Sequence, residues 1–270
     1  PKVLPYLTNQ RFDLGGKLYF CGEMNTSPTA EDPLSGFETY TRSKWGIFPH
    51  PRVTLKSIPT MFNSEPKIIM TTGAVTVPNY IQKKAGLKAE FHHVLAAVIV
   101  EIDADGDFFC RHLIADKQGG FQDLDVYVEN GKVDTGYTVE AITWGDLHTE
   151  RLDPKTALGS WGIDTDFTFA AEYADSMLHV LQPSVQFFHD AIDFRRRNHH
   201  NIDDPYFRFK AWINGEESVE DELASVASFL DAVCDPERET IIVDSNHDRA
   251  LTRWLKTANY KHDPSTPCSS

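Results

Sequence analysis

The sequence predicts an α/β fold in which layers of mixed β-sheet are flanked by helices, with an α+β tendency in the first half. After Gly136, apolar β-prone runs alternate with segments of helical periodicity, a pattern typical of parallel or mixed sheets covered by helices. Before Gly136, prolines and glycines interrupt the chain and leave few long periodic segments. We therefore expect two domains: a mixed α/β or β-rich extension over residues 1–136, and a second domain over residues 137–270.

Strands and turns dominate the elements expected in the first half. The runs of apolar residues predict a strand, a helix, a hairpin of two strands around an aspartate-rich turn, and a further strand that ends at a turn at Asn130 and Gly131. In chain order these are residues 67–72, 77–84, 94–102 with 108–114, and 124–129.

In the second half, three apolar runs and three amphipathic segments follow one another. The strands are expected at residues 139–144, 185–188 and 240–243. The helices are expected at residues 169–181, 219–233 and 249–257, and Ser218 with Asp221 forms a capping box for the middle one.

Composition and charge limit the classes of function. With 270 residues, 41% of them hydrophobic and 24% charged, the chain can bury a sizeable core. The 40 Asp and Glu residues against 26 Lys and Arg residues give a formal net charge of −14. This argues against a surface that coats nucleic acid, because such binding depends on neutralising phosphates. It does not exclude a nuclease, since metal-binding carboxylates add to the negative count.

The location is expected to be cytoplasmic, without a membrane partner. No apolar run approaches the roughly 20 residues of a membrane span, and the first residues lack the pattern of a signal peptide. The four cysteines are widely spaced and form no C-x-x-C pair, so we expect reduced thiols.

Polar residues follow each strand that is expected in the second half. The three strings are residues 145–148 (Gly-Asp-Leu-His), 189–193 (His-Asp-Ala-Ile-Asp) and 245–248 (Ser-Asn-His-Asp). In sheets of this class, ligands bind beyond the carboxyl ends of the strands. Carboxylate, imidazole and amide groups that converge there suit a pair of divalent metal ions and phosphoester hydrolysis.

Each string suggests a role for particular side chains. Asp146 and His148, two residues apart, could reach one metal ion, and Asp190 could bridge two ions. Asn246 offers a neutral oxygen ligand, and His247 suits protonation of a leaving oxygen. Taken singly, each string also fits a turn or a helix N-cap. It is improbable that all three strings are only turns or helix caps.

The order D-x-H, then D-x-x-D, then N-H-D, each after a strand, resembles the calcineurin-like metallophosphoesterase superfamily. The resemblance implies that Asp146 and His148 hold a first metal ion and that Asp190 bridges both ions. It also implies that Asn246 binds the second ion and that His247 is the proton donor at the scissile phosphate. Mn²⁺ is the first choice for the two divalent ions, with Mg²⁺, Fe or Zn²⁺ as alternatives.

The third string extends this expectation to two neighbours, and the family pattern also shows departures. Asp248 is expected to take part in catalysis, and Arg249 is expected to bind substrate together with Asn246 and His247. Histidine and serine replace the glycines that usually begin the second and third blocks, and the late G-H-x-H block is absent. We therefore expect an incomplete catalytic domain, with these nearest substitutes for the late ligands: Glu150, His199 and His200. His262 is the one histidine after His247.

The first half resembles the pre-early DNA-degradation proteins of large tailed bacteriophages. The likeness rests on residues 72–76, on the pair His92 and His93 with the strand that follows, and on the run into residues 144–146. It implies DNA as the substrate, Mn²⁺ as the ion and the host cytoplasm as the location.

These observations predict a two-metal phosphodiesterase, a DNase, that hydrolyses DNA. Two alternatives stay open: a phosphomonoesterase acting on nucleotides or phosphoproteins, and a binding or assembly module of the same fold that lacks catalysis. The sequence is also compatible with a homo-oligomer.

Overall fold

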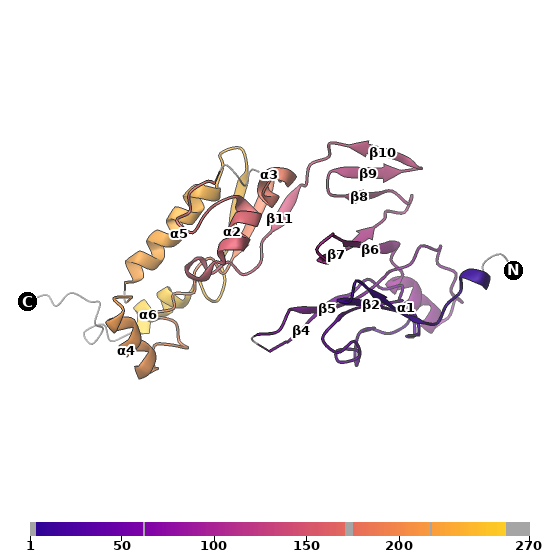
Figure 1. The fold of residues 1–270 in the computed structure, drawn as a ribbon, viewed down its shortest axis with the longest axis horizontal. Helices are drawn as coiled ribbons and strands as arrows, with labels where there is room; N and C mark the ends of the chain where they lie inside the picture. Colours follow the sequence, from indigo (N-terminus) through magenta and orange to yellow (C-terminus); the bar gives the residue numbers. More distant parts are fainter. Residues whose placement is uncertain (1–3, 62, 171–174, 217, 258–270) are drawn as a thin grey trace, which may run out of the picture. The chain divides into compact units, whose positions relative to one another are not determined.

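The computed structural model describes residues 4–61, 63–170, 175–216 and 218–257 (Figure 1). The chain divides into two compact units, Pro1–Gly136 and Tyr137–Ser270, and the division falls where the sequence pattern changes. Within the described residues, several sheets and six α-helices confirm the mixed α/β class. The assignment of a metallophosphoesterase-like role to the second unit stays a prediction.

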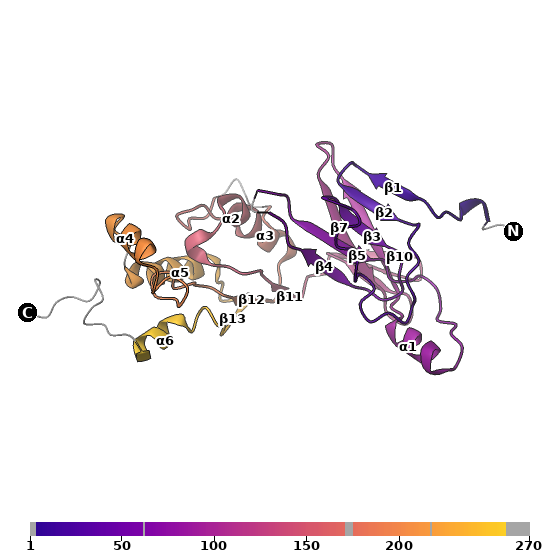
Figure 2. The same cartoon turned by 90° about the horizontal axis from the view of Figure 1, so that it is seen from below.

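A mixed five-stranded sheet forms the centre of the first unit, with the strand order β1-β2-β3-β5-β4 (Figure 2). The β2-β3 and β3-β5 pairs are parallel, and the outer pairs are antiparallel. Apolar side chains pack on both faces of this sheet, around Phe48 and Ile69 on one side and Leu18 and Met70 on the other. The strands are β1 (Arg11–Leu14), β2 (Leu18–Cys21), β3 (Trp45–Phe48), β4 (Leu55–Ile58) and β5 (Lys67–Thr71).

The rest of the first unit consists of a hairpin, a small antiparallel sheet and one helix. The predicted hairpin is confirmed as β6 and β7, and Asn130 and Gly131 form the predicted turn with positive φ angles of 51° and 73°. The elements are α1 (Lys84–His92), β6 (Ala96–Ile102), β7 (Phe108–Ile114), β8 (Phe121–Asp123), β9 (Val126–Glu129) and β10 (Lys132–Thr135), with a short 3-10 turn at Leu4–Tyr6.

The predicted helix over residues 77–84 is wrong, because the chain there is irregular and α1 begins only at Lys84. Pro78 lacks a backbone N–H and restricts the residue before it, so a helix that begins at Val77 is disfavoured.

The second unit contains a three-stranded parallel sheet in the order β11-β12-β13, which confirms the three predicted strands. Its strands are β11 (Ala141–Thr143), β12 (Val185–His189) and β13 (Glu239–Val243). Helices α2, α3 and α5 lie on the same side of this sheet (Figure 2). All three strands therefore end at the same edge.

The helices of the second unit agree with the sequence only in part. The long helix is confirmed as α5, whose N-cap Ser218 accepts a hydrogen bond from the backbone of Asp221, and the last helix is confirmed as α6. The helix predicted over residues 169–181 is short, and residues 171–174 lie outside the described ranges. The helices are α2 (Pro154–Trp161), α3 (Met177–Leu181), α4 (Pro205–Ile213), α5 (Val219–Val233) and α6 (Ala250–Thr257), with a 3-10 turn at Thr149–Arg151.

Two helices that the sequence did not reveal, α2 and α4, begin in the same way. Asp153 and Asp204 are their N-caps and accept hydrogen bonds from the first turn, and a proline occupies the first helical position of each. The Asp-Pro pair is therefore the signal that would have found both helices.

An aromatic core joins the parallel sheet to its helices. Phe188 of β12 packs between Trp161 of α2 and Phe229 of α5, with ring centroids 6.2 Å and 5.6 Å away. Trp144 lies against the Trp161 ring at 4.8 Å. Such contacts bury large apolar areas and hold the strands against the helices.

One buried amide connects the three strands. Gln186 in β12 is fully buried, and its Oε1 accepts a hydrogen bond from Trp144 Nε1 at 3.2 Å. Its Nε2 donates to the carbonyl oxygen of Val233 and to Thr240 Oγ1, both at 3.0 Å. All the hydrogen-bonding atoms of this amide thus have a partner, as a buried polar group requires.

No helix in the described part of the chain is long and apolar enough to cross a bilayer.

Candidate metal centre at the ends of three parallel strands

The three polar strings lie in the loops that follow β11, β12 and β13. Backbone bonds hold the first two loops together: His148 N–H donates to the carbonyl of Asp190 at 2.9 Å, and Thr149 N–H donates to that of Ala191 at 3.3 Å. The third loop is tied to the second, because Ile192 N–H donates to Asp248 Oδ1 at 3.3 Å. The edge of the sheet that bears the candidate residues is therefore cross-linked.

Two of the predicted metal ligands have a left-handed backbone. The φ angle is 41° at His148 and 49° at Asp190. This region is uncommon outside glycine, and non-glycine residues held there tend to cluster at functional sites. The turns bring both side chains into the region between the loops.

The first group of candidate ligands consists of Asp146, His189 and Asp190, one ligand atom of each lying within 4.8 Å of the others. His189 Nδ1 lies 2.9 Å from Asp190 Oδ2 and 3.5 Å from Asp146 Oδ1. The imidazole thus lies between two carboxylates from neighbouring strands.

Electrostatics favour the charged forms in this group. The hydrogen bond that His189 makes to the Asp190 carboxylate raises the pKa of His189, and the negative charge of Asp146 adds to the effect. Burial would raise the pKa of Asp190, but hydrogen bonds from Ser245 and His189 and the charge of His247 together lower it. Asp190 is therefore ionised at neutral pH, the form that binds metal ions.

The second group consists of His148, Asp193 and His247, again with one ligand atom of each within 4.8 Å of the others. The His148 and His247 rings meet edge to face with centroids 4.9 Å apart. His247 Nδ1 lies 2.7 Å from Asp193 Oδ1. A carboxylate bound to Nδ1 fixes the ring and leaves Nε2 available for chemistry.

A buried network holds Asp193 in place. Asn198, itself buried, donates from Nδ2 to Asp193 Oδ1 at 3.2 Å, and its Oδ1 accepts from the backbone N–H groups of His200 and Asn201 at 3.1 Å each. The backbone N–H of Asp193 donates to Glu150 Oε1 at 3.1 Å. Asp193 is thereby fixed at its backbone and its side chain, and it orients His247.

The residues present fit divalent cations. His148 Nδ1 and Asp190 Oδ1 are buried and have no hydrogen-bond partner within the described ranges. A buried polar atom left without a partner costs free energy, which a bound cation would recover. Imidazole nitrogen and carboxylate oxygen are ligands that first-row divalent metals accept.

The structure brings the predicted ligands together in a grouping that differs from the expected one. Asp146 lies with Asp190, as expected, but His148 groups with His247 and not with Asp146. The reason is local: the left-handed backbone at His148 turns its ring toward His247. Asn246 lies in the exposed turn after β13, where the sequence placed it.

Asp248 and Arg249 have structural partners where catalytic and substrate-binding roles were expected. Asp248 Oδ2 accepts hydrogen bonds from the backbone N–H of Ser245 at 3.2 Å and from its hydroxyl at 2.8 Å. With Oδ1 bonded to Ile192, this carboxylate fixes two loops. Arg249 forms an exposed ion pair with Asp244 at 2.6 Å.

The proposed substitutes for the missing late ligands separate in the structure. Glu150 lies beside Asp193 and keeps a buried Oε2 without a partner in the described ranges, whereas His199 and His200 are exposed and pack on each other. His262 lies outside the described residues.

Three residues of the site were not selected from the sequence. Asp193 ends the D-x-x-D string, and this second carboxylate was a signal for the partner of His247. His189 replaces a family glycine next to the bridging position, which was also a visible signal. Asn198 had none, because only the fold brings it to Asp193.

Comparison with known proteins relates the chain to a bacteriophage protein. No protein-family model matches the chain, and no solved structure matches it. The chain is similar to "Protein A1" of Escherichia phage T5, with 39% identity over 266 residues. The match includes 96% of this chain and 45% of that protein, so the chain spans about half the length of this curated relative. Identity at this level over nearly the whole chain shows common ancestry, and the protein is therefore a homologue of a bacteriophage protein.

Proposed function

We propose that the second unit is a metal-dependent phosphodiesterase that hydrolyses DNA. The observation that carries this proposal is the meeting of two His and Asp groups at the ends of three parallel strands. The buried atoms His148 Nδ1 and Asp190 Oδ1, which have no partner in the described ranges, support it further.

Particular side chains would hold the cations. Asp146 and Asp190 would hold one ion, together with His189 once the ion displaces its proton, and His148 from the other group would hold the second. Asp190 is the carboxylate that both ions would share, because its Oδ1 is buried without a partner in the described ranges. Asn246 would add a neutral oxygen. When bound, the ions, with Mn²⁺ the first choice, lower the pKa of a water molecule and stabilise charge on the phosphate oxygens.

His247 would act as the general acid. Its Nδ1 is bonded to Asp193, so the transferable proton is held at Nε2. Asp193 stabilises the protonated ring and is itself fixed by Asn198 and Glu150. Delivery of the Nε2 proton to the leaving oxygen would let the phosphodiester bond break without forming a free alkoxide.

The choice of DNA follows from the resemblance of the first half to phage DNA-degradation proteins. Similarity to a phage protein supports that resemblance. A phage nuclease of this kind would act in the host cytoplasm.

The test measures plasmid degradation beside hydrolysis of p-nitrophenyl phosphate, with Mn²⁺, Mg²⁺, Fe²⁺ or Zn²⁺ supplied in turn. We expect the plasmid to be degraded with Mn²⁺ and the monoester to react poorly. Strong monoester hydrolysis with intact DNA would make the protein a phosphatase. No turnover with any ion, together with weak Mn²⁺ binding by calorimetry, would leave a binding or assembly module.

A further inference from the structure

Three aromatic side chains of helix α4 are largely exposed to solvent. Tyr206, Phe209 and Trp212 are 75%, 58% and 62% exposed. Ala211 is buried and Phe207 is half-buried, so one narrow face holds the helix to the unit. Large exposed apolar patches usually mark binding surfaces.

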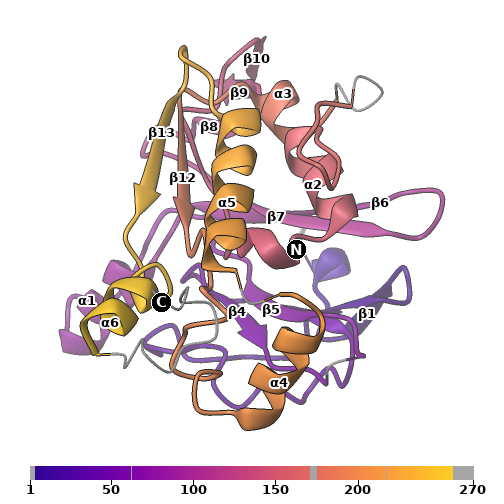
Figure 3. The same cartoon turned by 90° about the vertical axis from the view of Figure 1, so that its left-hand side faces the viewer.

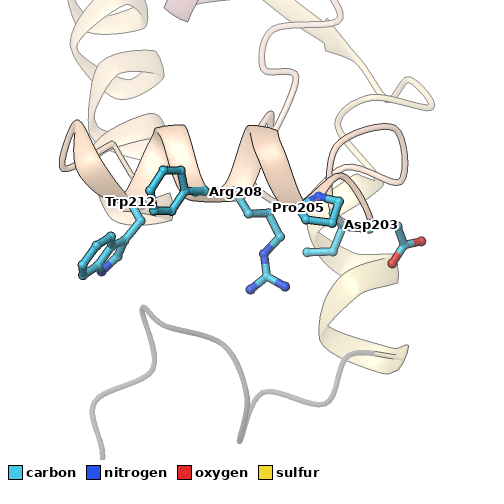
Figure 4. Close-up of a pocket in the computed structure, with 6 residues that line it drawn as sticks. Asp203, Pro205, Arg208 and Trp212 are labelled. Carbon is cyan, nitrogen blue, oxygen red and sulfur yellow. The ribbon is translucent and has the colours of Figure 1, made fainter.

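A shallow hollow of about 560 Å³ runs along this helix. Figure 4 shows Arg208 and Trp212 projecting from the same side of α4, with Pro205 and Asp203 at its beginning. A guanidinium group and an indole ring thus border one hollow. The lining residues are Ile202, Asp203, Pro205, Arg208, Phe209 and Trp212.

The charge of this segment is opposite to that of the chain. Residues 195–213 contain five Arg or Lys residues and two Asp residues, whereas the whole chain has a formal net charge of −14. Asp204 is engaged as the N-cap of α4. Neither Arg208 nor Lys210 forms an ion pair with a carboxylate in the described part of the chain. These two cations are therefore available to an anionic partner.

The segment also connects directly to the candidate site. Only residues 194–204 separate Asp193 from α4, and Arg195 lies over the Phe207 ring with its Cζ 5.0 Å from the centroid. Figure 3 shows α4 beyond the ends of β12 and β13 that carry the site. A polymer bound in the site could therefore extend over this helix.

We propose that the α4 surface, defined as Tyr206, Arg208, Phe209, Lys210 and Trp212, binds single-stranded DNA next to the site. The proposal rests on the proposed function, because it extends the substrate of that site. Bases stack on exposed aromatic rings regardless of sequence, and Arg and Lys contact the phosphates. A duplex fits less well, since its bases already stack on each other. Aromatic rings interleaved with unpaired cations favour a nucleic acid over an apolar protein partner.

The experiment measures the affinity of the full chain for a labelled oligothymidylate by fluorescence anisotropy, in EDTA so that no cleavage occurs. We expect Trp212→Ala and Phe209→Ala each to weaken binding about 10-fold, the usual worth of one stacked base. Phe109→Ala is the matched control, because Phe109 is also 58% exposed but lies in the first unit. It should leave the affinity unchanged.

Two further variants separate stacking from damage to the helix and from charge. Trp212→Phe keeps an aromatic ring and should restore most of the binding that Trp212→Ala loses. Arg208→Gln should lower the slope of log affinity against log salt by about 0.7, the value for one phosphate contact on a single strand.

The outcomes distinguish this inference from the proposed function. Equal affinities for parent, Trp212→Ala and Phe109→Ala would overturn it, even if DNA cleavage is observed. Tighter binding of duplex than of single strand, or self-association of the parent that Trp212→Ala abolishes, would also overturn it. Binding that depends on α4 without cleavage under any metal would sustain it and refute the phosphodiesterase.

Discussion

The two units use their charged residues differently. In the first unit, acidic side chains pair with Lys or Arg and lie dispersed around the sheets. Arg111 binds Asp123 at 2.7 Å and also contacts Glu101, and Lys44 binds Asp13 at 2.8 Å. Such pairs satisfy both partners and stabilise local structure.

In the second unit, the acids of the two candidate ligand groups face histidines. Asp146 and Asp190 flank His189, and Asp193 binds His247. Histidine can lose its charge near neutral pH, so these groups can exchange protons or bind metal ions. Charge in the first unit therefore serves mainly structural pairing, whereas the second unit carries the groups for which we propose chemistry.

The largest effect is expected for Asp190→Asn. A neutral amide cannot offset the repulsion between two cations, so we expect the loss of at least one metal ion and a fall in DNA hydrolysis by orders of magnitude. Calorimetric titration with Mn²⁺ and a plasmid assay measure both. Asp231→Asn, on the exposed face of α5, is the matched control. Two bound ions and near-normal rates in Asp190→Asn would refute the two-metal interpretation.

The substitution His247→Asn should remove the general acid and spare the metal ions. We expect hydrolysis to slow by about 10²–10⁴-fold while Mn²⁺ affinity stays close to that of the parent. A parallel loss of metal binding would instead make His247 a ligand, as its grouping with His148 also allows.

Asn198→Ala tests the buried support of Asp193. The change leaves buried partners unsatisfied, so we expect a loss of about 1–3 kcal/mol in the free energy of unfolding. Urea denaturation followed by tryptophan fluorescence measures it, because four of the five tryptophans lie in the second unit. The pH profile of hydrolysis should also shift, since Asp193, which orients His247, loses the hydrogen bond from Asn198. An unchanged profile would limit Asn198 to a structural role.

Asp123→Asn tests the use of charge in the first unit. The hydrogen bonds from Arg111 lower the pKa of Asp123, so this carboxylate stabilises the fold above its unfolded pKa. We expect the variant to lose up to about 1 kcal/mol at neutral pH. The difference should vanish as the pH falls through the folded pKa. Hydrogen exchange of the β8 and β9 amides reports it, and an effect on DNA hydrolysis would contradict the division of roles.

The smallest effect, with the opposite sign, is expected for Glu222→Gln in α5. Burial raises the pKa of Glu222, the charge of Glu150 adds to the rise, and Arg196 offsets only part of it. A carboxyl with a raised pKa stabilises the fold below its unfolded pKa and loses that contribution as the pH rises through the folded value. We therefore expect Glu222→Gln to raise the urea midpoint slightly at neutral pH and to leave it unchanged in acid. A lower midpoint at neutral pH would show that the pair with Arg196 dominates.

The sequence predicted the parts of the fold whose signals are local. The three parallel strands are continuous apolar runs, and α5 combines a capping serine with regular apolar spacing. Strands β1 to β4 have only four residues each, too few to show a period. Helix α4 was not predicted, because aromatic residues occur on several sides of it and its sequence lacks the regular alternation of apolar and polar faces.

The candidate site was predictable to the same extent. Asp146, His148, Asp190 and His247 were found because each lies in a loop that follows a strand. Their division into two groups depends on backbone angles at His148 and Asp190, which the sequence does not reveal. Asn198 was missed because its contact with Asp193 exists only after the chain folds back on itself.

The buried amide of Gln186 limits how far β12 can shift along its neighbouring strands, and therefore how far Asp190 can move. A strand slips in whole residues, and one step moves its end by about 3.3 Å. That distance is most of the 4.8 Å within which the ligand atoms of each group lie. A slip of β12 by one residue would also separate the Gln186 amide from its partners Trp144 and Thr240. The amide would then face an apolar layer without hydrogen bonds. Gln186 lies away from the proposed chemistry, yet its hydrogen bonds favour a single register of β12. This register fixes the position of Asp190 relative to the other candidate ligands.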